Sequence, residues 1–203
     1  APAPYCYCPP WLVVNWLVGD TCTVLPDTAS LAALLAHLHH QPLFGWRVRL
    51  LPSLQRYWQQ SDPARRTIHW WRALKKCHQL GEPRGLRLAP LHMDIHPGNL
   101  ILTDDGLRLI DWEYAGDGDI ALELATLMLD NPGGEELLTA YSAAMNINRD
   151  VLHRQVRRWL PWVCLLMASW YEWRWHQTRS DEFIRLADPL WRRLRTWHKE
   201  ERL

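Results

Sequence analysis

Hydrophobic residues recur every three or four positions along most of this chain, which is the spacing of one face of an α-helix. In the first half of the chain the pattern predicts helices over about residues 28–38, 51–60 and 61–80. Asp27 or Thr28 can cap the first helix, and the third has Pro63 in its first turn and Gly81 as its stop. The predicted inward faces consist of Leu31, Leu34, Leu35 and Leu38 in the first helix and of Ile68, Trp71 and Leu74 in the third.

The second half of the chain continues this helical pattern. Helices are predicted over residues 119–129, which residues 131–134 end, and over 135–145 and 150–177, with a kink at Pro161. Ser180 is expected to cap a short helix, and Asp188-Pro189 to open the last one. The inward stripe of the longest helix is formed by Leu152, Val156, Trp159, Val163 and Trp170.

Two stretches depart from the helical spacing. Residues 1–10 are rich in proline and predict an extended segment, and the almost continuously apolar residues 11–17 predict a buried strand that ends before Gly19. Further on, apolar residues flank Asp104-Asp105-Gly106 on both sides. Because Asp-Gly favours the positive φ angles of a tight turn, this second stretch predicts a β-hairpin.

The predicted hairpin brings three polar side chains to one of its ends. Asp94 and Asn99 precede its first strand, and Asp111 follows its second. Mg²⁺ prefers oxygen ligands and keeps several waters, so one or two side chains and the phosphates of a nucleotide complete its shell. Asn99 and Asp111 suit that role, and Asp94 is placed to accept a hydroxyl proton. The order of these residues is that of a kinase catalytic loop; a polar loop whose acids cap turns is the alternative.

The residues around the hairpin resemble a known superfamily. The motif His-x-Asp-x-His-Pro-Gly-Asn at residues 92–99, followed by Ile-Asp-Trp-Glu-Tyr-Ala-Gly at 110–116, is similar to the aminoglycoside phosphotransferase and choline kinase superfamily. Within it, residues 107–125 and the upstream run 57–66 look like those of the bacterial thiamine kinases. The resemblance covers nearly the whole chain.

The resemblance implies an α+β fold, namely the large C-terminal lobe of a protein-kinase-like enzyme, mostly helical around a catalytic β-hairpin. Residues 1–20 would be a remnant of the small lobe with the hinge strand, and residues 21–203 the helical lobe. The small lobe of such kinases covers ATP with a glycine-containing loop and a basic residue.

We expect this small lobe to be largely missing here, because the first glycine is Gly19 and the lysines are Lys75, Lys76 and Lys199. The chain alone is then expected to bind ATP weakly and to transfer phosphate slowly or not at all. Apolar surface around residues 11–16 is expected to promote aggregation.

The activity implied by the resemblance is transfer of the γ-phosphoryl group of ATP to the hydroxyl of thiamine, giving thiamine phosphate, with ATP and Mg²⁺ as cofactors. Asp94 is the implied catalytic residue, and Asn99 and Asp111 are the implied metal ligands. His92 and Asp119 are implied to support the loop. The implied nucleotide contacts are the backbone of Asn15, Trp16 and Leu17 and the side chains of Ile101 and Ile110.

The thiamine ring is cationic, so a binding site needs a negative partner and π faces. Trp112, Glu113, Trp170 and Trp173 are the candidates for these contacts. Burial in the core is the alternative for each tryptophan, and it is favoured for each one singly.

Three other functions stay open. The acceptor could be another small alcohol, such as choline or an aminoglycoside, or the chain could be a non-catalytic module of kinase shape. Residues 116–121 also match the dinucleotide-binding pattern GxGxxA. Two observations count against an oxidoreductase: five residues separate Ile110 from Gly116, and Asp117 and Asp119 place negative charge where a pyrophosphate would bind. Capping suits both aspartates better.

Composition adds limits rather than a function. A chain of 203 residues with 48% hydrophobic residues suits one domain or one large lobe, and a net charge of +1 requires neither nucleic acid nor a membrane as partner. Five cysteines without a CxxC pair predict reduced thiols in a cytoplasmic protein. The most apolar segment, residues 159–173, is too short to span a bilayer. A small-molecule substrate is therefore expected, and the oligomeric state stays open.

Two clusters have both a structural and a functional interpretation. His37, His39 and His40 crowd the end of the first helix, where complementing the helix dipole is favoured over binding a metal. Arginines at positions 154, 157 and 158 could bind phosphates, but a solvated helix face is favoured.

Overall fold

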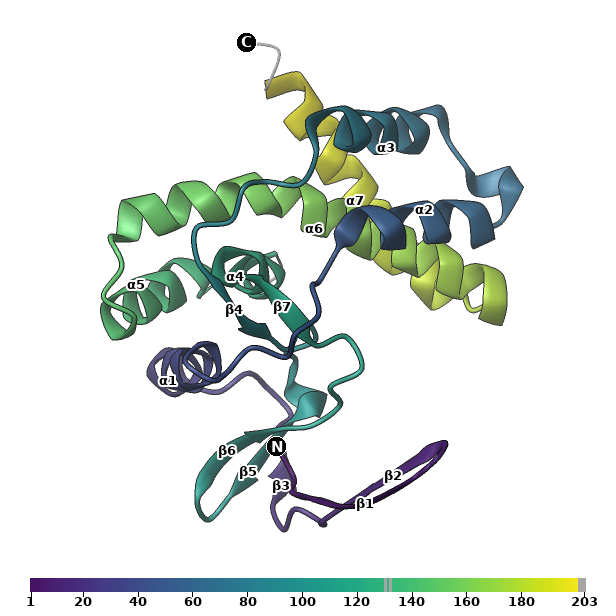
Figure 1. The fold of residues 1–203 in the computed structure, drawn as a ribbon. Helices are drawn as coiled ribbons and strands as arrows, with labels where there is room; N and C mark the ends of the chain where they lie inside the picture. The colour runs from purple at the N-terminus through teal and green to yellow at the C-terminus, as the bar shows by residue number, and fades with distance from the viewer. Residues whose placement is uncertain (130, 132, 201–203) are drawn as a thin grey trace.

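A long helix, α6 (Arg149–Thr178), runs through the centre of the molecule and organises the others (Figure 1). The computed structural model describes residues 1–129, 131 and 133–200. Helix α6 packs against α2, α4, α5 and α7, and α1 packs against α5. These helices are α1 (Thr28–His39), α2 (Leu50–Gln60), α3 (Ile68–Leu80), α4 (Ile120–Met128), α5 (Gly134–Ala144) and α7 (Asp181–Glu200), with short 3₁₀ turns η1 (Pro63–Arg65) and η2 (Pro97–Asn99).

The boundaries of α6 have simple local causes. Asn148 caps its start by accepting hydrogen bonds from the N–H groups of Asp150 and Val151, and Arg179 ends it in the left-handed conformation at φ 56°. Its inward stripe is largely as predicted: Leu152, Val156, Trp159 and Val163 are buried, whereas Trp170 is only half-buried. Pro161 lies inside the helix without ending it.

The strands form small antiparallel sheets: β4 and β7 lie among the helices in Figure 1, and the other strands lie below them. The predicted hairpin is confirmed as β5 (Leu100–Thr103) and β6 (Gly106–Leu109), with Thr103 opposite Gly106 and the positive φ of 99° at Gly106. Strand β3 (Asp20–Thr21) pairs with the other edge of β5. Separately, β4 (Leu88–Leu91) pairs with β7 (Gly116–Asp119). A mostly helical body around a β-hairpin, the predicted α+β class, is thus confirmed.

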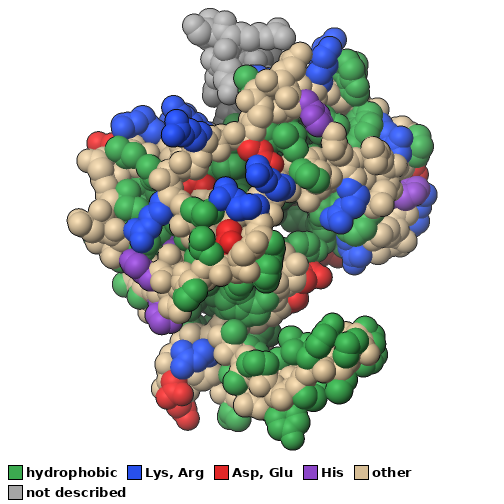
Figure 2. All heavy atoms as spheres, in the orientation of Figure 1, with side chains coloured by type: hydrophobic (Ala, Val, Ile, Leu, Met, Phe, Trp, Pro, Cys, Tyr) green, Lys and Arg blue, Asp and Glu red, His purple; other side chains and the backbone are tan. Residues whose placement is uncertain are grey.

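The predicted buried strand over residues 11–17 is wrong in two respects. Only β2 (Trp11–Val14) is a strand, and it forms a hairpin with β1 (Pro4–Cys8). Its side chains are exposed, with 72% of Trp11 open to solvent, and Trp16 in the following segment is 89% exposed. Hydrophobicity predicted burial, but no second layer of described residues packs on this hairpin, and Figure 2 shows hydrophobic side chains gathered over it.

The helix predicted over residues 61–80 is also divided. Its first part is the turn η1, and α3 begins afresh after Thr67, which accepts a hydrogen bond from the N–H of Trp70. The predicted inward face is partly wrong, because Ile68 and Trp71 are 54% and 44% exposed. Trp70 is buried instead, between the rings of Trp58 and Trp191 at 5.1 and 5.3 Å.

The last helix differs from the prediction as well. Helix α7 is continuous through Pro189, whereas the sequence predicted one helix after Ser180 and another from Asp188. Buried Ala187 and Leu190 flank the proline, and α7 packs along α6. Tertiary packing therefore outweighs the local cost of a proline in the helix.

The ends of the other helices agree with the sequence. Asp27 caps α1 by accepting the N–H of Ser30, and Gly81 ends α3 at φ 69°. Helix α4 ends at Met128, and of the residues predicted to end it, Pro132 lies outside the described residues. Among the helices described, none combines the length and apolar character needed to cross a membrane.

Candidate active site

The loop of residues 92–99 connects β4 to β5 and carries two of the three predicted polar residues. The side-chain amide of Asn99 donates to the backbone oxygen and to Oδ2 of Asp94, both at 3.0 Å. Because its nitrogen bonds Asp94, the Oδ1 atom of Asn99 is the oxygen that can face a cation. The predicted pair therefore does lie together, and the turn η2 between its members is capped by His96, whose Nδ1 accepts the N–H of Gly98.

Asp111 follows the second strand of the hairpin and lies beside this loop. The N–H of Ile110 donates to the backbone oxygen of Asn99 at 3.1 Å, which fixes the start of the 111–115 segment next to Asn99. Asp111 is exposed and adopts the left-handed conformation at φ 61°. Non-glycine residues rarely adopt this conformation, and it is concentrated at functional sites. Met93, next to Asp94, has φ 68°.

His92 is fully buried and connects the loop to the same segment. Its Nδ1 accepts the N–H of Asp94 at 3.3 Å, and its Nε2 lies 2.9 Å from the backbone oxygen of Ile110. These partners require the proton on Nε2, so the ring is a bridge and has no free nitrogen for proton transfer. This geometry fits the predicted supporting role of His92.

The carboxylate that holds the loop is Glu123 of α4, which the sequence did not single out. Its Oε1 accepts the N–H groups of His92 and Met93 at 2.7 and 2.6 Å. Glu123 is completely buried. Its place one helical turn after Asp119 was a possible signal, but acid residues at that spacing are common on helices.

Glu123 is itself anchored by a residue of α1. Its Oε2 lies 2.7 Å from Nε2 of His39, and Nδ1 of His39 contacts the hydroxyl of Tyr141 on α5. A neutral imidazole satisfies all three groups, with Tyr141 donating to Nδ1 and Nε2–H donating to Glu123. Both ring nitrogens of His39 are occupied by protein partners, which leaves none for a metal ion. Burial, followed by the charge of Glu123, raises the pKa of Tyr141 well above its usual range.

The predicted loop-supporting role of Asp119 does not match its contacts. Asp119 caps α4 through the N–H of Ala121, as the capping prediction for this residue expects, and its Oδ2 accepts bonds from Gln155 and Trp159 of α6, both at 2.8 Å. It therefore ties α4 to α6, while Glu123 reaches the loop. Asp117 caps no helix: it accepts the N–H groups of Phe44 and Gly45.

The residues predicted to contact adenine lie on two separate segments. Ile101 is buried on β5 and Ile110 is half-buried after β6. Gly19 packs against β5, where an added Cβ would lie 2.3 Å from the backbone oxygen of Leu102. Upstream of this contact the chain turns towards its N-terminus, and the N–H of Asn15 bonds the oxygen of Ala3.

Four aromatic residues lie close together beside the 111–115 segment, and we call Tyr57, Tyr114, Trp170 and Trp173 the aromatic cluster. The ring of Tyr57 on α2 lies 5.3 Å from that of Trp173 on α6. Burial raises the pKa of Tyr114, the charge of Glu113 raises it further, and a hydrogen bond from Trp170 opposes both. Glu113 and Trp170 thus lie at Tyr114, and Trp173 lies at Tyr57.

Two members of the aromatic cluster were missed by sequence reasoning, and one candidate belongs elsewhere. Tyr57 and Tyr114 both fall inside the two runs that carry the family resemblance, which was the available signal. Trp112 instead packs its ring 4.6 Å from His92 and donates to the oxygen of Leu109. Trp112 therefore supports the 92–99 loop and does not belong to the aromatic cluster.

The oxygen atoms of Asn99 and Asp111 suit a cation that is also held by the phosphates of a bound nucleotide. Among the described residues, no group of three or more His, Cys, Asp and Glu side chains gathers as a metal site. Asn99 Oδ1 and the Asp111 carboxylate are oxygen donors, which is what Mg²⁺ requires when phosphates and water supply its remaining ligands.

Comparison with known protein families gives a result that agrees with this site geometry. A profile of the phosphotransferase enzyme family matches residues 2–160. The chain belongs to this family.

Individual relatives in sequence narrow the comparison to one kind of phosphotransferase. The chain is 56% identical over 195 residues to a thiamine kinase of Escherichia coli (strain SMS-3-5 / SECEC), and the match covers 96% of this chain and 71% of the relative. A thiamine kinase of Shigella dysenteriae serotype 1 matches with the same identity and coverage.

Solved structures share the fold at low sequence identity. A choline/ethanolamine kinase family protein from Mesorhizobium loti superposes with a TM-score of 0.75 at 20% identity, over 97% of this chain and 73% of that chain. The choline kinase LicA from Streptococcus pneumoniae gives a TM-score of 0.69 at 18% identity, over 96% of this chain and 74% of that chain. The protein-kinase-like fold predicted from the sequence is confirmed.

Removing the Glu123 carboxylate is expected to loosen the 92–99 loop. Glu123→Ala leaves two buried N–H groups without an acceptor, and at about 1–3 kcal/mol for each group the free energy of unfolding should fall by roughly 2–6 kcal/mol. Glu123→Gln keeps an oxygen for both N–H groups and should lose clearly less. Urea denaturation of the two variants checks this, and equal losses would contradict the assigned role of Oε1.

Proposed function

We propose that this phosphotransferase moves the γ-phosphoryl group of ATP to the hydroxyl of thiamine, giving ADP and thiamine phosphate. The observation that carries the proposal is the 56% identity to thiamine kinases over 96% of the chain. The contact of Asp94 with Asn99, beside Asp111, supports the chemistry, because it supplies a base and two oxygen donors at one place.

Asp94 is the proposed base. Its Oδ2 is held by the amide of Asn99 at 3.0 Å, and its side chain is 36% exposed, so the carboxylate is both oriented and open to a substrate. The thiamine hydroxyl gives its proton to Asp94 while its oxygen forms a bond to the γ-phosphorus. The bond from that phosphorus to the β-phosphate oxygen breaks, and ADP leaves with the electron pair.

Asn99 and Asp111 are the proposed magnesium ligands, through Oδ1 and the carboxylate. These two residues would hold Mg²⁺ beside the phosphates, where the ion would supply positive charge against the charge that develops in the transfer. His92 keeps both segments at a fixed separation, since it bonds the N–H of Asp94 on one side and the oxygen of Ile110 on the other. Ile101 and Ile110 are the proposed floor for adenine, with the backbone of residues 15–17 as its edge.

The aromatic cluster with Glu113 is the proposed thiamine site. It offers indole and phenol faces together with a carboxylate, which suits a cationic ring. Tyr114 of this cluster lies three residues after Asp111. A thiamine ring bound at the cluster would therefore have the thiamine hydroxyl within reach of Asp94. The same chemistry also suits choline, which the structural relatives named above make the second candidate.

A panel of acceptors tests the proposed substrate. The purified chain is incubated with γ-labelled ATP, Mg²⁺ and either thiamine, choline or an aminoglycoside, and labelled ester is separated and counted. Thiamine is expected to give the highest kcat/KM, even if absolute turnover is low. A preference for choline would reassign the acceptor, and thiamine binding without any ester would favour the non-catalytic module.

Asp94→Asn should lower kcat by about two to four decades, because an amide cannot accept the hydroxyl proton. Asn is isosteric with Asp and can still accept the bond from Asn99, so the fold and the affinity for Mg²⁺-ATP should be kept. Turnover is measured with the labelled assay, and calorimetry of nucleotide binding serves as the control. A kcat near that of the wild-type chain would remove Asp94 from the mechanism.

Asp111→Ala should weaken Mg²⁺-ATP binding more than Asn99→Ala does, because a carboxylate carries the negative charge that the amide lacks. Calorimetric titration with ATP, in the presence and absence of Mg²⁺, measures both variants. Only the magnesium-dependent part of the affinity should change. The metal assignment fails if Asp111→Ala binds Mg²⁺-ATP as tightly as the wild-type chain.

A further inference from the structure

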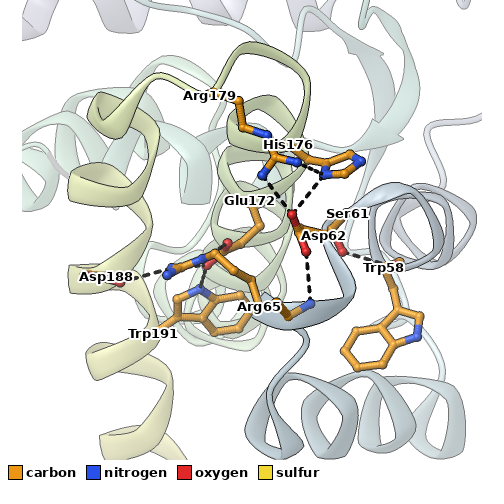
Figure 3. A network of polar contacts seen from close by, with 10 residues as sticks. Trp58, Ser61, Asp62, Arg65, Glu172, His176, Arg179, Asp188 and Trp191 are labelled. Carbon is orange, nitrogen blue, oxygen red and sulfur yellow. Dashed lines mark hydrogen bonds and ion pairs between the residues drawn. The ribbon is translucent and has the colours of Figure 1, made fainter.

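The segment of residues 61–66, which joins α2 to α3, is fastened to α6 by two ion pairs (Figure 3). Arg65 pairs with Glu172, and Asp62 pairs with Arg179. We call these four residues the clamp. All four lie outside the site described above, and the segment belongs to the run of sequence that distinguishes the thiamine kinase resemblance.

The Arg65–Glu172 pair is the buried half of the clamp. Nε and an Nη atom of Arg65 donate to the two carboxylate oxygens of Glu172 at 2.6 and 2.8 Å, and Nε1 of Trp191 donates a third bond at 3.0 Å. Glu172 is 2% exposed. The bond to Glu172 is also the main cause that raises the pKa of Arg65. A carboxylate buried on α6 is thus satisfied by α7 and by the 61–66 segment at once.

The Asp62–Arg179 pair is the more exposed half. Asp62 accepts a bond from Arg179 at 2.8 Å and lies 3.4 Å from Nδ1 of His176. The guanidinium of Arg179 lies 4.6 Å from the centre of the Trp175 ring, and that of Arg65 lies 5.6 Å from it. Exposed pairs stabilise proteins little, so this half acts mainly by fixing the direction of the segment.

Helix geometry relates the clamp to the aromatic cluster. Glu172 and His176 are spaced i and i+4, so they form one stripe along α6, and Arg179 follows as the C-cap of the helix. Trp170 and Trp173 are spaced i and i+3 and form a second stripe on a neighbouring face. Holding the first stripe against the 61–66 segment fixes the rotation of α6 about its axis, and therefore the direction in which both tryptophans point.

The 61–66 segment also connects the clamp to the aromatic cluster through α2. Asp62 follows the end of α2, and Tyr57 lies on the last turns of that helix with its ring 5.3 Å from Trp173. The clamp therefore fixes α2 relative to α6 at the place where these two helices supply three of the four cluster residues.

We propose that Arg65 and Glu172 are positioning residues that determine specificity for the cationic acceptor, by setting the separation of Tyr57 from Trp170 and Trp173. This inference rests on the proposed function of the aromatic cluster. Neither residue takes part in the chemistry. Loss of the paired geometry moves the walls of the acceptor site and leaves the Asp94 end of the hairpin in place.

Arg66 provides a matched control. It is the neighbouring arginine in the same segment, but its Nη2 donates to the backbone oxygens of Gln59 and Ser61, and its guanidinium lies over Trp58. Its bonds therefore stay on the α2 side and do not reach α6. Arg65→Lys and Arg66→Lys both keep the charge and both lose the planar fork that only arginine has.

The kinetic test compares these two variants with both substrates. Arg65→Lys should raise KM for thiamine roughly 10-fold to 100-fold, the scale of a displacement of about 1 Å, while KM for ATP changes less than about 2-fold. Arg66→Lys should leave KM for thiamine within about 2-fold as well. An equal rise for both substrates, or an equal effect of Arg66→Lys, overturns the inference, because either result describes a general loss of structure.

A spectroscopic test needs no turnover. In protein labelled with 5-fluorotryptophan, the ¹⁹F signals of Trp170 and Trp173 are assigned by Trp→Phe variants. Arg65→Lys should shift both signals, and Arg66→Lys should leave them. Unmoved Trp170 and Trp173 signals in Arg65→Lys overturn the inference whatever the activity is. A wild-type chain that binds no thiamine removes the proposed substrate, and the ¹⁹F result still decides whether the clamp positions the tryptophans.

If Arg65→Lys does not fold, a milder variant tests the same inference. Trp191→Phe removes one of the three bonds to Glu172 and keeps Arg65 in place. It should shift the same two ¹⁹F signals in the same direction by a smaller amount and raise KM for thiamine less. The absence of any shift in a folded Trp191→Phe protein counts against the clamp.

Discussion

The 92–99 loop keeps its shape because one buried oxygen, Oε1 of Glu123, accepts two consecutive backbone N–H groups. Burying the N–H groups of His92 and Met93 without partners would cost about 1–3 kcal/mol each. The charge on Glu123 is supported in turn by His39, whose other nitrogen contacts Tyr141. Helices α1, α4 and α5 thus act on the loop through a single carboxylate, and the positions of Asp94 and Asn99 depend on it.

The same support explains how two left-handed residues persist at the site. Met93 and Asp111 have φ angles of 68° and 61°, which cost free energy in residues with a Cβ. The N–H of Met93 bonds Glu123, and the oxygen of Ile110 next to Asp111 bonds His92. Each unusual conformation therefore has beside it a hydrogen bond between the backbone and a buried side chain, and together these bonds bring the loop and the end of the hairpin to one place.

Helix α6 serves the core and the proposed acceptor site with different parts of its length. Its first half buries Val156 and Val163, while its second half presents half-buried tryptophans next to a buried carboxylate. Glu172 would be costly in that position without partners, and Arg65 and Trp191 supply them. Substrate recognition in this family member would then depend on polar contacts behind the aromatic cluster as much as on the rings themselves.

The sequence by itself determined the local features: the Asp-Gly hairpin, the caps of α1 and α3 and the five-residue spacing that joins Asp94 to Asn99. These follow from turn chemistry, capping and short-range spacing, which act within a few residues. Only the tertiary structure decided that Glu123, rather than Asp119, reaches the loop, because that choice depends on how α4 is oriented against β4. The tertiary structure also leaves Trp11 exposed, although the surrounding residues 11–17 are apolar. Burial requires a second layer of residues to pack against, and hydrophobicity alone does not supply one.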